Sequence, residues 1–247
     1  IMKETMEKHD VIIDIKPVSI ENLPFISGFL PAGALPDRTE FTVSPTAHFG
    51  IGGVITDEET RTCITRLFAC GEVVGGLHGA NRLAGNALSE CFVMGRVAGE
   101  NAAMVAHGTP LKQPDPADVA AEKARLESML GDEKGNLNGL IHSLKELTWF
   151  QAGIIRHQSG LKEALAKIKE IRSLAAGLRS ASVKDLTKQL KLYNMLLVAE
   201  MVVLAALERK ESRGAHYRED FPEEEPGWLA NLIITNKKGE IKLEKKL

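Results

Sequence analysis

The stretch GLHGANRLAGNALSE, from Gly76 to Glu90, decides how this chain is interpreted. It places His78 and Arg82 among three glycines and then runs directly into a sequence with the pattern of a helix. A loop that only reverses the chain rarely carries an arginine and a histidine so close to a backbone this permissive. The arrangement indicates a site where backbone amides and a cation meet something flat or negatively charged.

The sequence that follows, NALSECFVMGRVAGENAA, predicts a helix from about Asn86 to Val105. Its first amides have no acceptor inside the helix, and the positive end of the helix dipole adds to their attraction for anions. This end can therefore receive a pyrophosphate or an electron-rich carbonyl. Gly95 and Gly99 give the helix a smooth face suited to close packing against a sheet, and packing alone accounts for them.

A second signal precedes the loop. LFACGE, residues 67–72, predicts an apolar strand that ends in Gly-Glu. Glu72 at such a strand end can accept hydrogen bonds from the sugar or ribityl hydroxyls of a dinucleotide, and Gly71 lets the ligand lie close to the backbone. A surface glutamate in a turn is the alternative interpretation of Glu72.

Composition limits the class of protein. The chain has 247 residues, is 44% hydrophobic and carries a formal net charge of −2, which is typical of one large or two modest soluble domains. The charge gives no general reason to expect nucleic acid or an anionic membrane as a partner. The longest apolar run, residues 195–207, is shorter than the roughly 20 residues of a membrane span and contains Glu200.

The cysteines and the first residues bear on the compartment. Cys63, Cys70 and Cys91 are odd in number and form no CxxC pair, so we expect neither a disulfide framework nor a metal site. The N-terminal residues lack the layout of a signal peptide, which favours a reducing cytoplasm. Ile1 opens in the middle of a helical pattern with no cap before it, so we expect this chain to be the C-terminal part of something longer.

Secondary-structure signals divide the chain near Pro110. Before it, VIIDI (11–15) predicts a short buried strand, and residues 39–57 predict a strand, a turn, paired glycines and a second strand. After the linker QPDPAD (113–118), the pattern is almost entirely helical. We expect helices at 117–129, 137–156, 160–177 and 183–209, packed as an antiparallel bundle, then a polar irregular tail (209–228) and a C-terminal β-hairpin with NKKG as its turn.

Arg82 and His48 are the candidate substrate ligands. The guanidinium of Arg82 is a planar fork that matches a carboxylate and stays charged in a dry pocket. His48 stands just before the paired glycines Gly52 and Gly53, where the chain turns. A histidine can equally be a hydrogen-bonded structural residue. We assign His78 a structural or supporting role.

Three motifs together are more specific than any of these signals. PTAHFGIGGVITDEETRTCITRLFACGE, GLHGANRLAGNALSE and RKESRGAHYREDFPEE occur in the order and spacing that resembles the flavoprotein subunits of fumarate reductase and succinate dehydrogenase, and their relative L-aspartate oxidase. The resemblance covers most of the chain. It implies an α/β plus all-α fold: the C-terminal part of a split, glutathione-reductase-like FAD-binding domain with a capping-domain remnant, followed by a helical bundle. Residues 1–38 would be the tail of the capping domain, 39–110 the returning half of the FAD domain and 111–247 the C-terminal helical domain.

The resemblance also implies roles for residues. Glu72 would bind FAD hydroxyls, Gly52 and Gly53 would lie near the flavin, and His48 and Arg82 would grip the dicarboxylate substrate. The helix start would lie at the pyrimidine edge of the flavin through Asn86, Ala87 and Leu88. ESRGAHYRED (211–220) would fold back as a structural brace between the flavin region and the bundle.

The implied reaction is hydride transfer between flavin N5 and a C4 dicarboxylate, fumarate or succinate. The family's proton-donor arginine and its GxGxxG motif would lie upstream of Ile1, so no proton donor is assigned and we expect this chain alone to be inactive. L-Aspartate oxidase is the nearest alternative, and a non-catalytic helical assembly module is an alternative of another class. The expected partners are the missing N-terminal half and an iron–sulfur subunit, which would hold a cytoplasmic protein at the inner face of a membrane.

Overall fold

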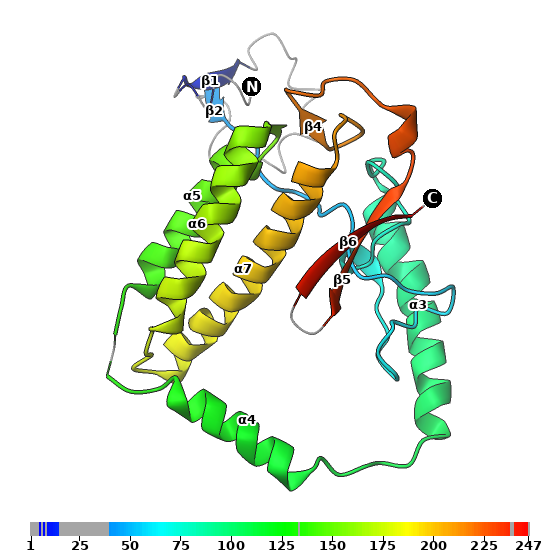
Figure 1. Ribbon diagram of the computed structural model, residues 1–247. Helices are drawn as coiled ribbons and strands as arrows, with labels where there is room; N and C mark the ends of the chain where they lie inside the picture. The colour runs from blue at the N-terminus through cyan, green and yellow to red at the C-terminus, as the bar shows by residue number, and fades with distance from the viewer. Residues whose placement is uncertain are drawn as a thin grey trace. The chain divides into compact units, whose positions relative to one another are not determined.

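The structure is a computed structural model that describes residues 5, 7, 9–14, 40–132, 134–237 and 240–246. The chain divides into two compact units, residues 1–48 and 49–247. Among the described residues, the first unit contributes a two-stranded sheet and the second contains the long helices (Figure 1). The predicted domain limits after residues 38 and 110 stay predictions.

In the first unit, strands β1 (Val11–Asp14) and β2 (Glu40–Val43) pair antiparallel. The strand predicted at 11–15 is thus confirmed over four residues, but its predicted burial is wrong, since Ile12 and Ile13 are 56% and 48% exposed. A two-stranded ribbon has no second layer of its own to cover its faces. Most of the predicted capping-domain tail, residues 1–38, lies outside the described residues.

Residues 49–85 form loops held by single pairs rather than by strands. Val54 bridges Val74 in parallel and Arg61 bridges Phe68 antiparallel, while Gly71–Val73 forms one turn of 3-10 helix. The strand predicted at 67–72 is therefore wrong, and the second strand predicted within 39–57 is reduced to the bridge at Val54. A strand requires a continuous ladder of partners, and in the described part of the chain these segments find only isolated ones.

Helix α3 (Asn86–His107) follows, as the sequence predicts, and extends two residues beyond the predicted end. Gly85 caps its start in the left-handed conformation, with φ of 86°, and Gly108 ends it. Of its residues, all of which the structure describes, only Glu90 and Ala98 are buried. More than half of its residues are exposed in the described chain, and most of the others are half-buried.

Four further helices confirm the helical second half: α4 (Pro116–Ser128), α5 (Leu137–Ala152), α6 (Gln158–Ala176) and α7 (Val183–Glu208). Each starts where a side chain accepts a hydrogen bond from a backbone amide of the first turn, which satisfies a donor that the helix itself cannot. The capping side chains are those of Asp115, Asn136, His157 and Ser182, respectively. α5 ends four residues before the predicted limit, because Gly153 and the short strand β3 (Ile155–Arg156) follow it.

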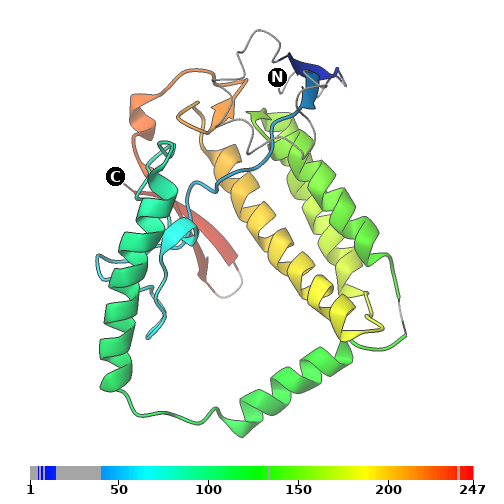
Figure 2. The ribbon, with the colours of Figure 1, turned by 180° about the vertical axis from the view of Figure 1, so that it is seen from behind.

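Helices α5, α6 and α7 lie side by side in both views (Figures 1 and 2) and close the hydrophobic core between them. Short connections between successive helices make them antiparallel neighbours. The most deeply buried core side chains come from all three helices: Leu144 from α5, Leu161 and Ile168 from α6, and Leu192, Leu196 and Val203 from α7.

Helix α4 is not part of this bundle, so the predicted packing of all four helices is wrong. None of its residues is buried. Its sequence, PADVAAEKARLES, contains only Val119 and Leu126 as large apolar residues, which cannot form the stripe that a packed helix needs. The bundle is built from α5, α6 and α7.

Helix α7 has the length and composition of a helix that could cross a membrane, with a mean hydropathy of 1.8 in its most apolar window. It does contain charge: Glu200 accepts a hydrogen bond from the Arg172 guanidinium at 2.6 Å, across to α6. One side of α7 is committed to the bundle core, as the full burial of Leu192 and Val203 shows. The length and composition of α7 are those of a core helix as much as of a membrane span.

After α7 the chain forms small sheets. Strand β3 pairs in parallel with β4 (Tyr217–Arg218), which ties the end of α5 to the segment beyond α7. Strands β5 (Asn231–Lys237) and β6 (Glu240–Lys246) form the predicted antiparallel hairpin. The last two residues of its predicted NKKG turn, 238 and 239, lie outside the described residues.

Candidate functional site

The glycine loop, defined as Gly76–Gly85, is bent by three glycines with positive φ: 106° at Gly76, 57° at Gly79 and 86° at Gly85. The amide of Gly79 donates to the carbonyl of Gly76 at 3.2 Å, which closes the first turn. Side chains disfavour this backbone region, so the glycines let the loop fold tightly before α3.

The start of α3 is open to an acceptor from outside the helix. Gly85 has no side chain with which to cap the first turn, and Asn86 and Leu88 are exposed, Leu88 by 71%. The amide of Asn86 donates to the Leu83 carbonyl at a long 3.3 Å. The amides that follow keep the donor capacity that a polar cofactor edge can use.

Glu72 lies in the 3-10 turn that packs on α3. Its Oε1 accepts a hydrogen bond from the amide of Gly50 at 2.8 Å, and the side chain is exposed. Gly71, at φ of 76°, is buried so closely that a Cβ on it would lie 3.1 Å from Cys91 Sγ in α3. The sequence signal for Glu72 is thus placed at the end of a tight turn rather than at the end of a strand.

Backbone packing explains why a glycine is required at one of the paired positions, Gly53, but not at the other, Gly52. Val54 donates to the carbonyl of Val73 at 2.8 Å, and a Cβ on Gly53 would clash with that same carbonyl. Gly75 approaches Gly53 equally closely from the other side. Gly52, in contrast, has positive φ and open space where a Cβ would lie. Gly53 is needed for this crossing of two chain segments, whereas Gly52 faces outward.

Arg82 is half-buried and is held by stacking rather than by acidic partners. Its Cζ lies 4.4 Å from the centre of the Phe49 ring, a distance at which a cation is attracted to the ring face. Its Nη1 donates to the Leu83 carbonyl at 3.1 Å, and its buried Nε has no hydrogen-bond partner among the residues that the structure describes. Within the described residues no carboxylate forms an ion pair with Arg82.

On another side, Phe49 contacts His78, which pairs with the buried Glu90. The Phe49 and His78 rings meet edge to face, with centres 5.5 Å apart and planes at 72°. His78 Nε2 lies 2.8 Å from Glu90 Oε2, and the Glu90 side chain is almost fully buried. Glu90 belongs to α3, so this chain of contacts connects the helix to the guanidinium of Arg82.

The predicted site residues fall into two groups. The second unit gathers Glu72 and the Gly52–Gly53 segment near the turn that packs on α3, with Arg82 in the loop that leads into the same helix. His48 is exposed and ends the first unit, directly before Phe49 in the chain. Sequence reasoning missed Phe49 and Glu90. The aromatic residue next to His48 was the available signal for the first.

The segment predicted as a brace does contact the glycine loop. The amide of Ala215 donates to the carbonyl of Ala80 at 2.9 Å. Gly214, at φ of 58°, lies so close that a Cβ would clash with Ala80. A turn beyond α7 therefore rests on the loop that carries Arg82.

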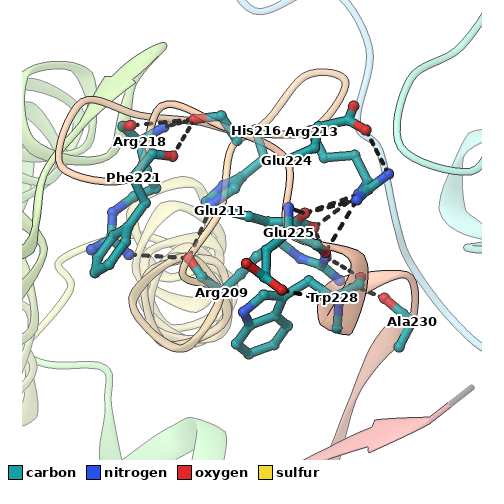
Figure 3. A network of polar contacts seen from close by, with 12 residues as sticks. Arg209, Glu211, Arg213, His216, Arg218, Phe221, Glu224, Glu225, Trp228 and Ala230 are labelled. Atoms are coloured by element: carbon teal, nitrogen blue, oxygen red, sulfur yellow. Dashed lines mark hydrogen bonds and ion pairs between the residues drawn. The ribbon is translucent and has the colours of Figure 1, made fainter.

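This turn is held by a set of polar contacts that we call the arginine network: Arg156, Arg209, Glu211, Arg213, His216, Arg218, Asp220 and Glu224. Figure 3 shows most of it, including Glu211 between Arg209 and Arg213. Glu211 is fully buried between Arg209 Nη1 at 2.5 Å and Arg213 Nη2 at 2.9 Å. Burial alone would raise its pKa, but the hydrogen bonds from Arg213, the Glu225 amide and Arg209 outweigh it and lower the pKa to about 2. Glu211 is therefore ionised over the physiological pH range.

Two further groups of the arginine network have lowered pKa values. Burial and then the charge of Arg156, whose Nη1 lies 2.9 Å from Nδ1, lower the pKa of His216 to about 4. Hydrogen bonds from Arg218, which is itself fully buried, lower the pKa of Asp220 to about 2. His216 is therefore neutral near pH 7 and its Nδ1 accepts from Arg156.

Two family models match this chain. Residues 4–88 match an FAD binding domain, and residues 141–246 match the C-terminal part of the fumarate reductase flavoprotein. The first match ends at Leu88, in the first turn of α3, and so contains every site residue predicted from the sequence. The second contains nearly all of the bundle and the arginine network.

Relatives of both kinds named by the resemblance are found. The chain is 36% identical over 238 residues to the fumarate reductase flavoprotein subunit of Haemophilus influenzae, covering 91% of this chain and 40% of that protein. It is 35% identical over 228 residues to L-aspartate oxidase of Pyrococcus horikoshii, covering 90% of this chain and 41% of that protein. This chain thus spans about two fifths of the length of these relatives.

The fold matches a solved structure as well. A quinol-fumarate reductase with menaquinol molecules aligns with a TM-score of 0.85 and 28% identity, over 99% of this chain and 47% of that one. The fold and both family models match flavoproteins, and one of the two models is an FAD binding domain. The chain belongs to the family of fumarate reductase, succinate dehydrogenase and L-aspartate oxidase flavoproteins.

Proposed function

We propose that this chain is the C-terminal portion of an FAD-dependent enzyme that interconverts fumarate and succinate. The observation that carries the proposal is Arg82: a guanidinium with no acidic partner among the described residues, stacked on the residue that follows His48. A cation left free at the mouth of a cofactor-binding loop is suited to the carboxylate of a small diacid.

The residues present fit a flavin dinucleotide. The open first turn of α3, at Asn86, Ala87 and Leu88, offers backbone amides and the positive end of the helix dipole to the electron-rich pyrimidine edge. Glu72 is exposed, and one of its oxygens is oriented by Gly50 while the carboxylate keeps capacity for sugar hydroxyls. Gly52, with open space beside it, lets a ligand lie against the backbone.

FAD supplies the redox chemistry of this family, by exchanging a hydride at flavin N5 with a substrate carbon. Reduction of fumarate adds that hydride to one alkene carbon and a proton to the other. Arg82 and His48 would hold one carboxylate, align the alkene and stabilise the negative charge that develops on the substrate. The proton donor is expected in the N-terminal portion that the relatives possess.

L-Aspartate oxidation is the alternative within the family, because a relative with that name matches this chain at 35% identity. Aspartate carries an ammonium group that fumarate lacks, so its pocket requires an acceptor or an anion beside the Cα. In the described part of this chain Arg82 stacks on the Phe49 ring, a contact that suits the carboxylate of either substrate. The group that meets the ammonium of aspartate is expected in the N-terminal portion that the relatives possess.

A non-catalytic assembly module is the alternative from another class. The bundle offers an apolar groove of about 430 Å³ between α5 and α7, lined by residues that include Leu144, Thr148 and Val202. As partners we propose the N-terminal portion of the flavoprotein and an iron–sulfur subunit, which would place the enzyme in the cytoplasm, at the inner face of a membrane.

The test uses the full-length flavoprotein that carries this sequence. Arg82→Ala should abolish fumarate turnover and leave the flavin content intact, because the guanidinium is assigned to substrate and not to FAD. Turnover of L-aspartate with no turnover of fumarate would select the alternative reaction. A colourless full-length protein that takes up no added FAD would leave only the assembly module.

A further inference from the structure

Glu90 is the charged one of the two buried residues of α3, the other being Ala98. It is 6% exposed, whereas Phe92 and Val93 beside it are 79% and 61% exposed. Burying a carboxylate is costly unless a donor satisfies it. The donor is His78 in the glycine loop, and the proposed function makes no use of either residue.

The hydrogen bond between the two fixes the histidine ring. An ionised carboxylate only accepts, so Nε2 of His78 carries the hydrogen and points at Glu90 Oε2 across 2.8 Å. This hydrogen bond restricts the orientation of the imidazole ring. Its neighbour is Phe49, which meets it at 72° and a centroid distance of 5.5 Å.

Phe49 in turn sets the plane of the Arg82 guanidinium. Arg82 Cζ lies 4.4 Å from the Phe49 ring centre, while its buried Nε has no partner in the part of the chain that the structure describes. Within the described residues, the one hydrogen bond of this side chain goes to the neighbouring carbonyl of Leu83. Stacking on Phe49, which is distant in sequence, is therefore the contact that orients the Arg82 guanidinium.

We propose that Glu90 and His78 are positioning residues that act through Phe49 to hold Arg82 in the orientation that binds a dicarboxylate. This inference rests on the proposed function, since it assigns Arg82 to the substrate. It makes Phe49 a specificity-determining residue: a flat aromatic face fixes the fork in one plane, as bidentate recognition of a carboxylate requires.

The experiment measures malonate, a non-reactive diacid, by its effect on flavin absorbance, together with fumarate KM and kcat, in the full-length FAD-loaded protein. Phe49→Leu keeps apolar volume and removes the ring face, so the malonate Kd should rise roughly 3- to 30-fold, the range of a cation–π contact. Phe49→Tyr keeps the face and should stay within about 2-fold of wild type.

Glu90→Gln should also raise the malonate Kd, by less than Phe49→Leu. In the double variant Glu90→Gln/Phe49→Leu the Kd should match that of Phe49→Leu within about 2-fold, because both changes act through one contact. Glu100→Gln is the matched control, since Glu100 lies on the same helix, is exposed and pairs only with Arg96 there. It should leave Kd, KM and flavin content unchanged.

The outcomes separate the two proposals. An unchanged malonate Kd in Phe49→Leu, with binding lost in Arg82→Ala, overturns the positioning role and leaves the proposed function standing. Multiplying effects in the double variant, or loss of flavin from Phe49→Leu, also overturn it. Malonate binding retained in Arg82→Ala contradicts the proposed function, and the positioning role with it.

Discussion

The bundle (residues 137–208) and the FAD-side region (residues 49–108) differ in how far their apolar side chains are buried. In the bundle, Leu161 and Leu192 are completely buried by the other helices. In the FAD-side region, Leu83 and Phe92 are 74% and 79% exposed. Other large apolar residues of this region are exposed as well: Ile55, Ile64, Leu67, Leu77, Leu88, Val93 and Met104.

The difference indicates where each region obtains its stability. Burying one large apolar side chain contributes about 1.5–3 kcal/mol, and the bundle gains this repeatedly from its own residues. The FAD-side region is instead shaped by glycines, isolated bridges and the Glu90–His78 pair. We expect the N-terminal portion of the flavoprotein and FAD to cover its apolar surface, so a cofactor site is formed where the chain does not complete its own core.

The largest expected effect concerns the arginine network that follows the bundle. Glu211→Ala should destabilise the protein by about 3–5 kcal/mol, because it leaves the partly buried charges of Arg209 and Arg213 without their common, fully buried partner. Glu224→Ala is the matched control, since Glu224 pairs with the same Arg213 but is 62% exposed. Urea unfolding measures both; equal small losses would show that the network does not stabilise this end of the bundle.

Because the two regions differ in burial, substitution of an apolar residue should destabilise the bundle more than the FAD-side region. Leu161→Ala should lower the free energy of unfolding by about 2–5 kcal/mol, through lost burial and the cavity it leaves. Leu88→Ala should change it by no more than about 0.5 kcal/mol in this chain, because Leu88 is exposed. Comparable losses in chemical denaturation would mean that the FAD-side region has a core of its own, and the comparison would fail.

Gly214 tests the contact between the brace segment (211–220) and the FAD-side region. Gly214→Ala should cost about 1–3 kcal/mol, because the position has a left-handed backbone and an added Cβ would clash with Ala80 in the glycine loop. Gly227→Ala is the control, since a Cβ there meets only ordinary contact with Glu225. Thermal melts that respond equally to both substitutions would argue against close packing of the brace on the loop.

The last expected effect is a pH dependence. The pKa of His216 is about 4 in the folded protein against an ordinary 6.5, so the unfolded chain binds the proton more readily. Stability is therefore fully present above pH 6.5 and falls as the pH drops towards 4, by at most about 1.4 kcal/mol per pH unit. His216→Gln, which cannot be protonated, should flatten this part of the curve in melts between pH 7 and pH 4. An equally steep loss in this variant would assign the dependence to other groups.

The helices were predictable from the sequence because their signals are local. Asn136 and Ser182 stand just before apolar residues at helical spacing, and each caps the helix that follows. The hairpin at the C-terminus was predictable from the same kind of short-range pattern. α4 was wrongly included in the bundle because a helical pattern does not say whether the helix has enough apolar surface to pack.

The site was only partly predictable because its contacts are distant in sequence. The strand predicted at 67–72 is wrong because pairing partners, unlike caps, are not visible in the segment itself. The glycine loop and the helix start were found from residue types alone. The contact of Phe49 with Arg82, and the burial of Glu90, require the fold to bring separate segments together.

Flavin content tests the central claim most directly, namely that the FAD-side region provides half of an FAD site. In the full-length protein, Glu72→Lys should lose most of the bound flavin, because the carboxylate is assigned to its hydroxyls and a lysine cannot accept hydrogen bonds. Glu58→Lys, at an exposed position of the same region, should purify with wild-type flavin absorbance. Wild-type flavin content in Glu72→Lys would contradict the account.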